Sequence, residues 1–292
     1  MTIIGSTFEE AKRKNNPSLL LAFFISFSPC SQMAAKIHES FYQLMRAKPF
    51  YFLLAGVLLF SCKKETEVLQ AELPSDYLPT IVGKYITYRL DSTVVINFGG
   101  NIVTRSYQEK HQIDAKVTDN LGRPSYRVFR FLRDKDGTEA WKPSGSYFIT
   151  PQTNTVEVVE NNLRFLKLVG PIVEGKIWTG NKFLPVDPYG PLYEFFNDDG
   201  MMDWEYSYDN IGTITLAGKT YNDVVTVEHI NDASNIPVVV DAVGYQNRSW
   251  EQYAKGIGMV YQEITMLEYQ PSSSPRPGFK GFGVKRTIID HN

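Results

Sequence analysis

Cysteine is nearly absent from this chain of 292 residues, which carries only Cys30 and Cys62. Histidine is scarce as well: the chain has four, and no two stand within four positions of each other, the spacing at which neighbouring imidazoles share a metal ion. Apolar runs are short, and none approaches the roughly 20 residues of a membrane-spanning helix. These absences argue against a disulfide scaffold, a conventional metal site and a permanent anchor helix.

Sequence patterns of catalysis are missing too. The part of the chain after Cys62 has no Gly-x-Ser-x-Gly elbow, no Ser-x-x-Lys pair and no glycine-rich loop leading into a helix. It has no block of basic residues either, and residues 62–292 hold 24 basic and 29 acidic side chains, a formal net charge of −5. We therefore expect no catalytic residue, no metal, no cofactor and no nucleic-acid partner, and the protein is predicted not to be an enzyme.

The most distinctive motif surrounds Cys62. A basic start at residues 45–48, an apolar run from Phe50 to Phe60 and a serine at position 61 lie directly before it. This order resembles the signal peptide and lipobox of Gram-negative bacterial lipoproteins. The resemblance implies cleavage before Cys62, a diacylglycerol thioether on its sulfur and a third acyl chain on its amine, so that the membrane becomes a partner through those chains. An ordinary secretory signal that happens to contain a cysteine is the alternative.

The same motif predicts how the first part of the chain is divided and where the protein is held. Translation is expected to begin at Met45. The segments are then an over-extended start (1–44), a signal peptide (45–61) and a flexible tether (62–78). Lys63 stands where an inner-membrane retention signal would place Asp, which favours the outer membrane. The charged run 63–67 resembles the export tag of surface-exposed Bacteroidetes-type lipoproteins; a merely solvated tether is the alternative.

From residue 79 onward the pattern predicts antiparallel β meanders. Residues 85–90 alternate between two faces of different polarity, which is the period of a half-buried strand. Further runs of β-branched or aromatic residues lie at 94–96, 126–133, 156–159, 224–227 and 259–269, with turns rich in Gly or Asn between them, such as Asn161-Asn162. The fold class is therefore mainly β, and a β-sandwich and an open barrel are both compatible with it.

Two segments of the chain recur in its second half. Residues 79–87 resemble residues 171–179, and residues 122–126 resemble residues 218–221. Duplication would produce two similar β lobes, at 79–170 and 171–292, whereas chance recurrence of Gly-Lys turns would produce the same echo. The order of 217–227 followed by 253–260 is also similar to that in Bacteroidetes-type outer-membrane lipoproteins of unassigned function, and this resemblance brings no catalytic residue with it.

The most unusual segment runs from Leu184 to Asp209 and mixes aromatic rings with carboxylates. Its candidate ligand-binding residues are Tyr189, Tyr193, Trp204, Tyr206, Asp199 and Asp203. Three interpretations stay open. The acids around Asp199 could supply oxygen ligands to Ca²⁺, although their spacing breaks the EF-hand pattern. The rings and acids could bind sugar or peptide, or act as a glycosidase through two carboxylates. Alternatively, the rings fill a core and the acids lie on a solvated loop.

The sequence thus predicts a lipid-anchored β domain that binds or scaffolds something at the outer membrane without catalysis. One alternative is a surface glycan-binding protein or glycoside hydrolase built on Tyr189–Asp209. A second alternative is a carrier of lipid or of another lipoprotein, because a curved antiparallel sheet can enclose acyl chains. The expected partners are therefore the membrane and either a glycan or another envelope protein.

Overall fold

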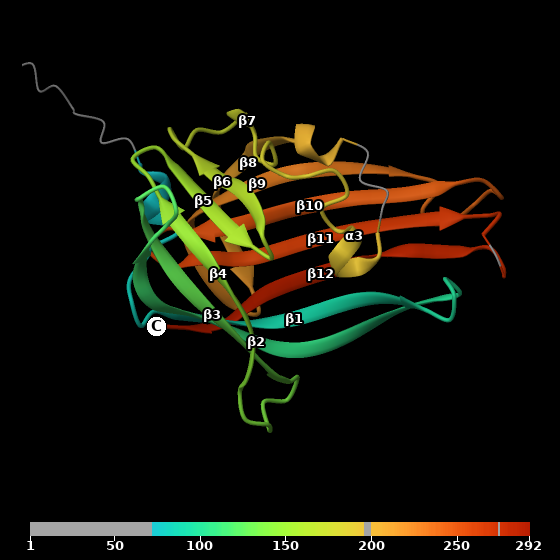
Figure 1. The fold of residues 1–292 in the computed structure, drawn as a ribbon, viewed down its shortest axis with the longest axis horizontal. Coiled ribbons are helices and arrows are strands. Elements are labelled where there is room, and N and C mark those ends of the chain that lie inside the picture. The colour runs from blue at the N-terminus through green and yellow to red at the C-terminus, as the bar shows by residue number, and fades with distance from the viewer. Residues whose placement is uncertain (1–71, 196–199, 274) are drawn as a thin grey trace, which may run out of the picture. The chain divides into compact units, whose positions relative to one another are not determined.

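The computed structural model describes residues 72–195, 200–273 and 275–292. The chain divides into two units, Met1–Val68 and Leu69–Asn292, and Cys62 with its predicted signal peptide lies outside the described residues. The second unit contains one antiparallel sheet of 12 strands (Figure 1). The prediction of a mainly β, antiparallel meander fold is confirmed. Within the described ranges no helix is long and apolar enough to cross a membrane.

The strands follow one another along the chain with short connections. They are β1 (Tyr85–Ile96), β2 (Asn101–Thr118), β3 (Pro124–Asp134), β4 (Lys142–Pro151), β5 (Thr155–Glu160), β6 (Leu163–Val169), β7 (Ile177–Thr179), β8 (Glu205–Leu216), β9 (Lys219–Ser234), β10 (Gly244–Ala254), β11 (Gly258–Gln270) and β12 (Gly278–His291). Short helical turns are η1 (Pro74–Tyr77), α3 (Gly190–Tyr193) and η2 (Met201–Asp203).

The sheet curls into a nearly closed barrel. Its order is β6-β5-β4-β3-β2-β1-β12-β11-β10-β9-β8-β7, so neighbours in sequence are neighbours in space and β1 pairs with β12. The edge strands β6 and β7 approach each other without forming a ladder. The amide of Leu166 donates to the carbonyl of Gly180 at 2.8 Å, and the indole N–H of Trp178 donates to the carbonyl of Leu166 at 2.9 Å. These two bonds join the edges near one end of the barrel.

The predicted turns form for the expected backbone reason. Asn161 and Asn162 join β5 to β6 with φ values of 52° and 63°, a region that Asn tolerates better than most residues. Ala217 and Gly218 make the same kind of two-residue connection between β8 and β9, with φ values of 48° and 78°. Tight turns of this hand match the twist of the flanking strands, which keeps the meander in register.

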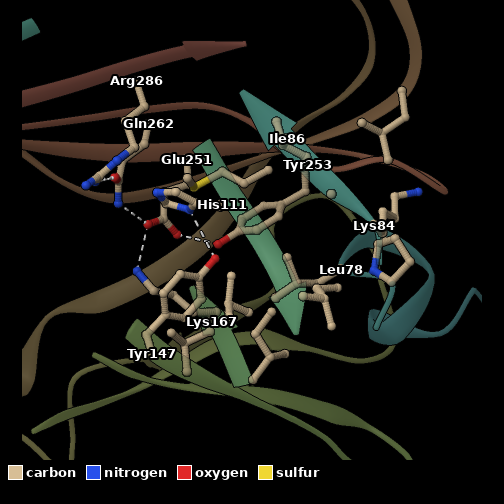
Figure 2. A pocket seen from close by; sticks show the side chains of 18 of the residues that line it. Leu78, Lys84, Ile86, His111, Tyr147, Lys167, Glu251, Tyr253, Gln262 and Arg286 are labelled. Carbon is tan, nitrogen blue, oxygen red and sulfur yellow. Dashed lines mark hydrogen bonds and ion pairs between the residues drawn. The ribbon is translucent and has the colours of Figure 1, made fainter. Parts of the chain in front are cut away.

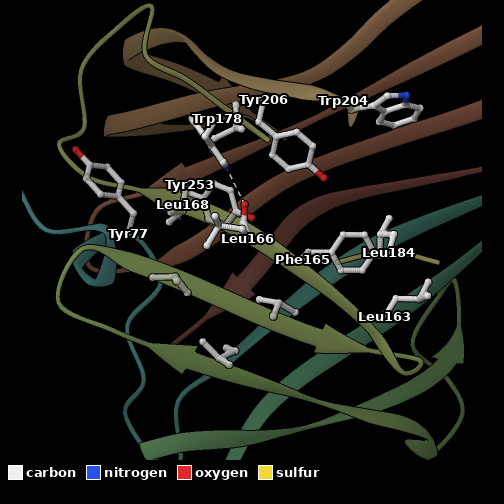
Figure 3. Close-up of a cluster of buried hydrophobic side chains, with 14 of the residues drawn as sticks. Tyr77, Leu163, Phe165, Leu166, Leu168, Trp178, Leu184, Trp204, Tyr206 and Tyr253 are labelled. Atoms are coloured by element: carbon white, nitrogen blue, oxygen red, sulfur yellow. Dashed lines mark hydrogen bonds between the residues drawn. The ribbon is translucent and has the colours of Figure 1, made fainter. Parts of the chain in front are cut away.

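The core lies inside the curved sheet. Strand residues alternate between the inside and the outside, and in the middle of β9 Val225, Val227 and His229 are buried while the residues between them are only partly buried. Tyr208, Val225 and Val227 are fully buried on the β8–β9 wall. A large cluster of aromatic and aliphatic side chains fills one side of the interior, where Trp178, Tyr206 and Tyr253 lie together (Figure 3).

The two predicted lobes correspond to the two halves of this one sheet. Residues 79–170 supply β1–β6, and residues 171–292 supply β7–β12. The repeated segments recur six strands apart, since one pair leads into β1 and β7 and the other leads into β3 and β9. The halves are hydrogen-bonded to each other through β1 and β12. The division into lobes by duplication stays a prediction.

The described end of the predicted tether is fixed to the barrel. Tyr77 in η1 is buried, and Glu72 pairs with Lys255 at 2.7 Å. The amide of Gly256 donates to the carbonyl of Asp76 at 2.7 Å. Residues 72–78 therefore belong to the folded unit and hold its start against the β10–β11 turn.

Candidate functional site

The main candidate site is a pocket inside the barrel, here called the interior pocket. It contains about 710 Å³ of space free of protein atoms, including space open to solvent. Its wall comes from strands all around the sheet, and one side of it is apolar: Ile86, Ile113, Val128, Ile149, Val158 and Met259. An apolar wall with a few convergent polar groups is typical of small-molecule binding sites.

The two ends of the interior pocket differ in chemistry (Figure 2). Leu78 and Lys84 lie at one end, here called the loop end because it is formed by the loops before β1 and after β10. Lys167, Glu251, Gln262 and Arg286 lie at the other end. Together with Glu109, which is hydrogen-bonded to Arg286, these charged and amide side chains are here called the polar cluster. An apolar wall thus connects a partly solvated loop end with a buried polar end.

Arg286 and Glu109 form one half of the polar cluster. The Nε atom of Arg286 donates to the carboxylate of Glu109 at 2.6 Å, and both side chains are almost completely buried. Burial by itself would raise the pKa of Glu109, but Arg286 and His111 outweigh it and hold this pKa well below its usual value. Burial likewise opposes the charge on Arg286, yet Glu109 keeps the pKa of Arg286 raised. The pair is therefore ionised although it is buried.

Glu251 and Lys167 form the other half. The ammonium of Lys167 and the amide of Gln262 both donate to the Oε1 atom of Glu251 at 2.6 Å, and the hydroxyl of Tyr253 donates to Oε2 at 2.5 Å. Burial raises the pKa of Glu251, but the lowering effects of Lys167, His229 and Tyr253 together outweigh it, and the net pKa is about 2. Since Lys167 lies on β6 and Glu251 on β10, this pair reaches across the interior between separate parts of the sheet.

Gln262 joins the two halves. Its carbonyl oxygen accepts a hydrogen bond from the Nη1 atom of Arg286, while its amide nitrogen donates to Glu251. The amide is oriented by these two contacts, because a carboxylate needs a donor and a guanidinium needs an acceptor. The polar cluster is consequently one connected network that runs from β2 to β6 through β12, β11 and β10.

Two histidines border this network. His111 lies on β2 with Nδ1 3.1 Å from the hydroxyl of Tyr147 and Nε2 3.2 Å from the carboxylate of Glu109. His229 lies on β9 with Nδ1 2.9 Å from the hydroxyl of Ser249. Both histidines are buried and hydrogen-bonded. Across the residues that the structure describes, no three His, Cys, Asp or Glu side chains are placed to hold a metal ion.

A second cavity lies on the far side of the polar cluster. It contains about 540 Å³ of space free of protein atoms and shares Lys167, Gln262 and Arg286 with the interior pocket. Tyr189 and Tyr193, from the segment Leu184–Asp209 that mixes aromatic and acidic residues (the aromatic–acidic segment), line it. Both contact Phe282 of β12. The ring of Tyr193 stacks on Phe282 with centroids 3.7 Å apart and planes 10° from parallel.

Three other predicted ligand-binding residues, Trp204, Tyr206 and Asp203, do not line that cavity. Trp204 and Tyr206 are buried, 9% and 2% exposed, in the hydrophobic cluster of Figure 3. Asp203 is exposed at the end of η2, and Asp199 lies outside the described residues. The structure thus brings Tyr189 and Tyr193 together but not the whole predicted set, and a sugar-binding role for this segment stays a prediction.

Sequence reasoning did not find the polar cluster. None of its members stands in a recognised motif, and they come from five strands. A usable signal is nevertheless present: Glu109-x-His111-x-Ile113 and Val284-x-Arg286-x-Ile288 place charges on the same strand face as buried aliphatic residues. A charge at an inward-facing position costs free energy unless it is paired, so such positions indicate a paired internal network.

Comparisons with known proteins add little. No protein-family model matches the chain, and no curated protein matches it. Among solved structures, the fold is similar to that of a "putative exported protein with YmcC-like fold" from Bacteroides fragilis. The two share 14% sequence identity, the alignment covers 73% of this chain and 98% of that chain, and the TM-score is 0.32. A likeness of this strength assigns no function.

Proposed function

We propose that this protein is an outer-membrane lipoprotein, anchored through acyl chains on Cys62, whose barrel binds an amphiphilic molecule without catalysing a reaction. The observation that carries the proposal is the interior pocket, in which an apolar wall leads to the polar cluster. Each methylene buried on such a wall contributes about 0.8 kcal/mol, so a chain of several methylenes supplies useful affinity. The polar cluster offers hydrogen bonds to the other end of the same molecule.

The position of the anchor supports this proposal. The chain enters the barrel through η1, and Leu78 and Pro79 directly after η1 line the loop end of the interior pocket. Residues 63–71 connect Cys62 to Glu72, two residues before η1, and this connection spans at most about 36 Å when fully extended. An acylated Cys62 would therefore hold the loop end close to the membrane, which is where amphiphiles are found.

Filling the interior pocket tests the binding proposal. Val158 lies on β5 and lines the pocket, whereas the adjacent Val159 points to the opposite face of the sheet and is not part of the lining. Purified full-length protein is extracted with organic solvent and the extract is analysed by mass spectrometry. We expect one co-purified amphiphile per chain in the wild type and in Val159→Phe, and a loss of at least about tenfold in Val158→Phe.

Equal binding by the two variants, with similar melting temperatures, would contradict a ligand in the interior pocket. Absence of any amphiphile from the wild type, followed by no binding of the fluorescent probe N-phenyl-1-naphthylamine, would end the proposal. The two Val→Phe variants add the same atoms to adjacent residues, so their difference reports which face of β5 the ligand touches.

The anchor has its own test. Cys62→Ala removes the only sulfur that the lipobox resemblance marks for acylation, and it leaves the barrel unchanged. We expect the variant to move from the outer-membrane fraction to the soluble periplasmic fraction, and the wild type to accumulate as an unprocessed precursor under globomycin. An unchanged membrane fraction for Cys62→Ala would refute the anchor while leaving the binding result valid.

A further inference from the structure

The polar cluster has the unusual property of being strongly charged in its parts and neutral as a whole. Arg286 is paired with Glu109 at 2.6 Å, and Lys167 is paired with Glu251 at 2.6 Å. Next to them, Arg130 is paired with Glu160. Each cation of this region therefore has its own carboxylate, and a ligand meets no uncompensated positive charge there.

The same cluster still has unused hydrogen-bond donors. Lys167 carries three N–H bonds and places one on Glu251; its remaining described contact is with the ring face of Phe165 at 4.7 Å. Arg286 carries five N–H bonds, and its described partners are Glu109 and Gln262. Within the described ranges, no other acceptor is recorded for these two cations. The carboxylate of Glu251, in contrast, accepts three hydrogen bonds.

We infer that the amphiphile bound in the interior pocket has an uncharged, oxygen-rich head, such as a glycerol ester or a sugar, and that this head lies against the polar cluster. This inference rests on the function proposed above. Hydroxyl, ester and carbonyl oxygens accept the spare N–H bonds of Lys167 and Arg286 without bringing in a net charge. An anionic head would add a charge to a buried and already neutral cluster, which costs free energy that no free cation there offsets.

The loop end offers the competing site for an anionic head. Lys84 lies there, its ammonium donates to the carbonyl of Gly256 at 2.5 Å, and no carboxylate pairs with it in the described part of the chain. Desolvation lowers the pKa of Lys84. An anion bound here would leave its tail against the polar cluster, so the charge preference of the pocket reports the orientation of the ligand.

The test compares amphiphiles with one tail and three heads. The full-length chain carrying Cys62→Ala is used, since it removes the acylation site and allows detergent-free measurements. Its dissociation constants for 1-lauroylglycerol, laurate and dodecyltrimethylammonium are measured by displacement of N-phenyl-1-naphthylamine below the critical micelle concentrations. We expect 1-lauroylglycerol to bind at least about tenfold more tightly than either charged amphiphile, a factor that corresponds to about 1.4 kcal/mol.

Removing one carboxylate should then change the preference. Glu251→Gln leaves the charge of Lys167 without a partner, and we expect the ratio of laurate to 1-lauroylglycerol affinity to rise at least about tenfold. The matched control is Glu263→Gln. Glu263 lies on β11, which pairs with the strand of Glu251, but it does not line the pocket, so this variant should leave the ratio unchanged. Where Glu251→Gln fails to fold by circular dichroism, the wild-type series alone decides the question.

Each outcome has a distinct meaning. Tighter binding of laurate than of 1-lauroylglycerol, abolished by Lys84→Gln, would overturn the inference and place an anionic head at the loop end. Tighter binding of dodecyltrimethylammonium would overturn it as well. Failure of all three amphiphiles to bind would instead refute the proposed function on which the inference rests.

Discussion

The phenol ring of Tyr206 lies flat on the imidazole of His229, with ring centroids 3.7 Å apart and planes 12° from parallel. Both side chains are buried, and a carboxylate oxygen of Glu251 lies 3.6 Å from the Nε2 atom of the imidazole. Burial lowers the pKa of His229 to about 3, and the opposite influence of Glu251 is smaller. The imidazole is therefore neutral at physiological pH and behaves as part of the aromatic core.

The first prediction concerns acid stability. The pKa of His229 is about 3 in the folded protein and about 6.5 in an unfolded chain. Below pH 6.5 this histidine is therefore protonated in the unfolded state but still neutral in the folded state. Stability contributed at neutral pH is then lost as pH falls from 6.5 towards 3. Between pH 7 and pH 5, the unfolding free energy of His229→Gln should fall by about 2 kcal/mol less than that of the wild type. Urea denaturation at the two pH values measures this difference.

Two features make this measurement specific. Between pH 7 and pH 8 His229 is neutral in both states, so the wild type and His229→Gln should show parallel stability curves there. Glu251, with a folded pKa of about 2, loses its contribution only below about pH 4.5, outside the window of the histidine. A wild-type decrease between pH 7 and pH 5 that is fully retained in His229→Gln would refute the assignment.

Much of the fold was predictable from local patterns. The alternation at 85–90, the valine-rich runs at 156–159 and 224–227 and the Asn161-Asn162 turn correspond to β1, β5, β9 and the β5–β6 connection. These features depend on strand periodicity and turn geometry, which act over a few residues. Strand β2 was missed because its inward positions include Glu109 and His111, so its sequence lacks the apolar alternation of its neighbours.

The site was not predictable for a related reason. The partners of the polar cluster are far apart in the chain: 84 residues separate Lys167 from Glu251, and 177 residues separate Glu109 from Arg286. Curling of the sheet brings Lys167 on β6 to Glu251 on β10, whereas Glu109 and Arg286 meet because β2 and β12 both pair with β1. The segment Leu184–Asp209 has a recognisable pattern because its rings and acids are close together in sequence, although Trp204 and Tyr206 are buried in the core.

The second prediction concerns the buried ion pair of Arg286 and Glu109. Arg286→Met leaves the carboxylate of Glu109 buried without its cation, and we expect the free energy of unfolding to fall by about 3–5 kcal/mol. The double variant Glu109→Leu/Arg286→Met removes both charges and should be more stable than Arg286→Met, because the desolvation cost disappears with the charges. Urea denaturation of the three proteins checks this, and strictly additive losses would contradict it.

The third prediction concerns the contact between α3 and the sheet. Phe282 is 3% exposed and contacts Tyr189, Tyr193 and Phe195, so Phe282→Ala removes the ring on which this segment packs. We expect a loss of about 3–5 kcal/mol in unfolding free energy and faster hydrogen exchange at residues 189–195. Phe279→Ala, on the same strand but packed on Tyr269, is the control and should leave exchange at 189–195 unchanged.

The fourth prediction concerns Gly281, whose φ of 115° and close contact with β11 both require glycine. A Cβ atom there would lie 1.9 Å from the carbonyl oxygen of Met266, whereas at Gly175, with φ of 79°, it would meet open space. Gly175→Ala should therefore cost only the backbone strain of about 1–3 kcal/mol, and Gly281→Ala should cost more, since β11 and β12 must also separate locally.

Strands β11 and β12 carry Gln262 and Arg286, so a local separation of the strands at Gly281 should also displace these two side chains of the polar cluster. We expect Gly281→Ala to weaken binding of N-phenyl-1-naphthylamine, while Gly175→Ala, in the loop before β7, leaves it unchanged. Denaturation and probe binding are measured on both variants. Equal stability losses in the two would show that strain alone governs Gly281, and unchanged probe binding in Gly281→Ala would show that the β11–β12 ladder absorbs the added methyl group before it reaches Arg286.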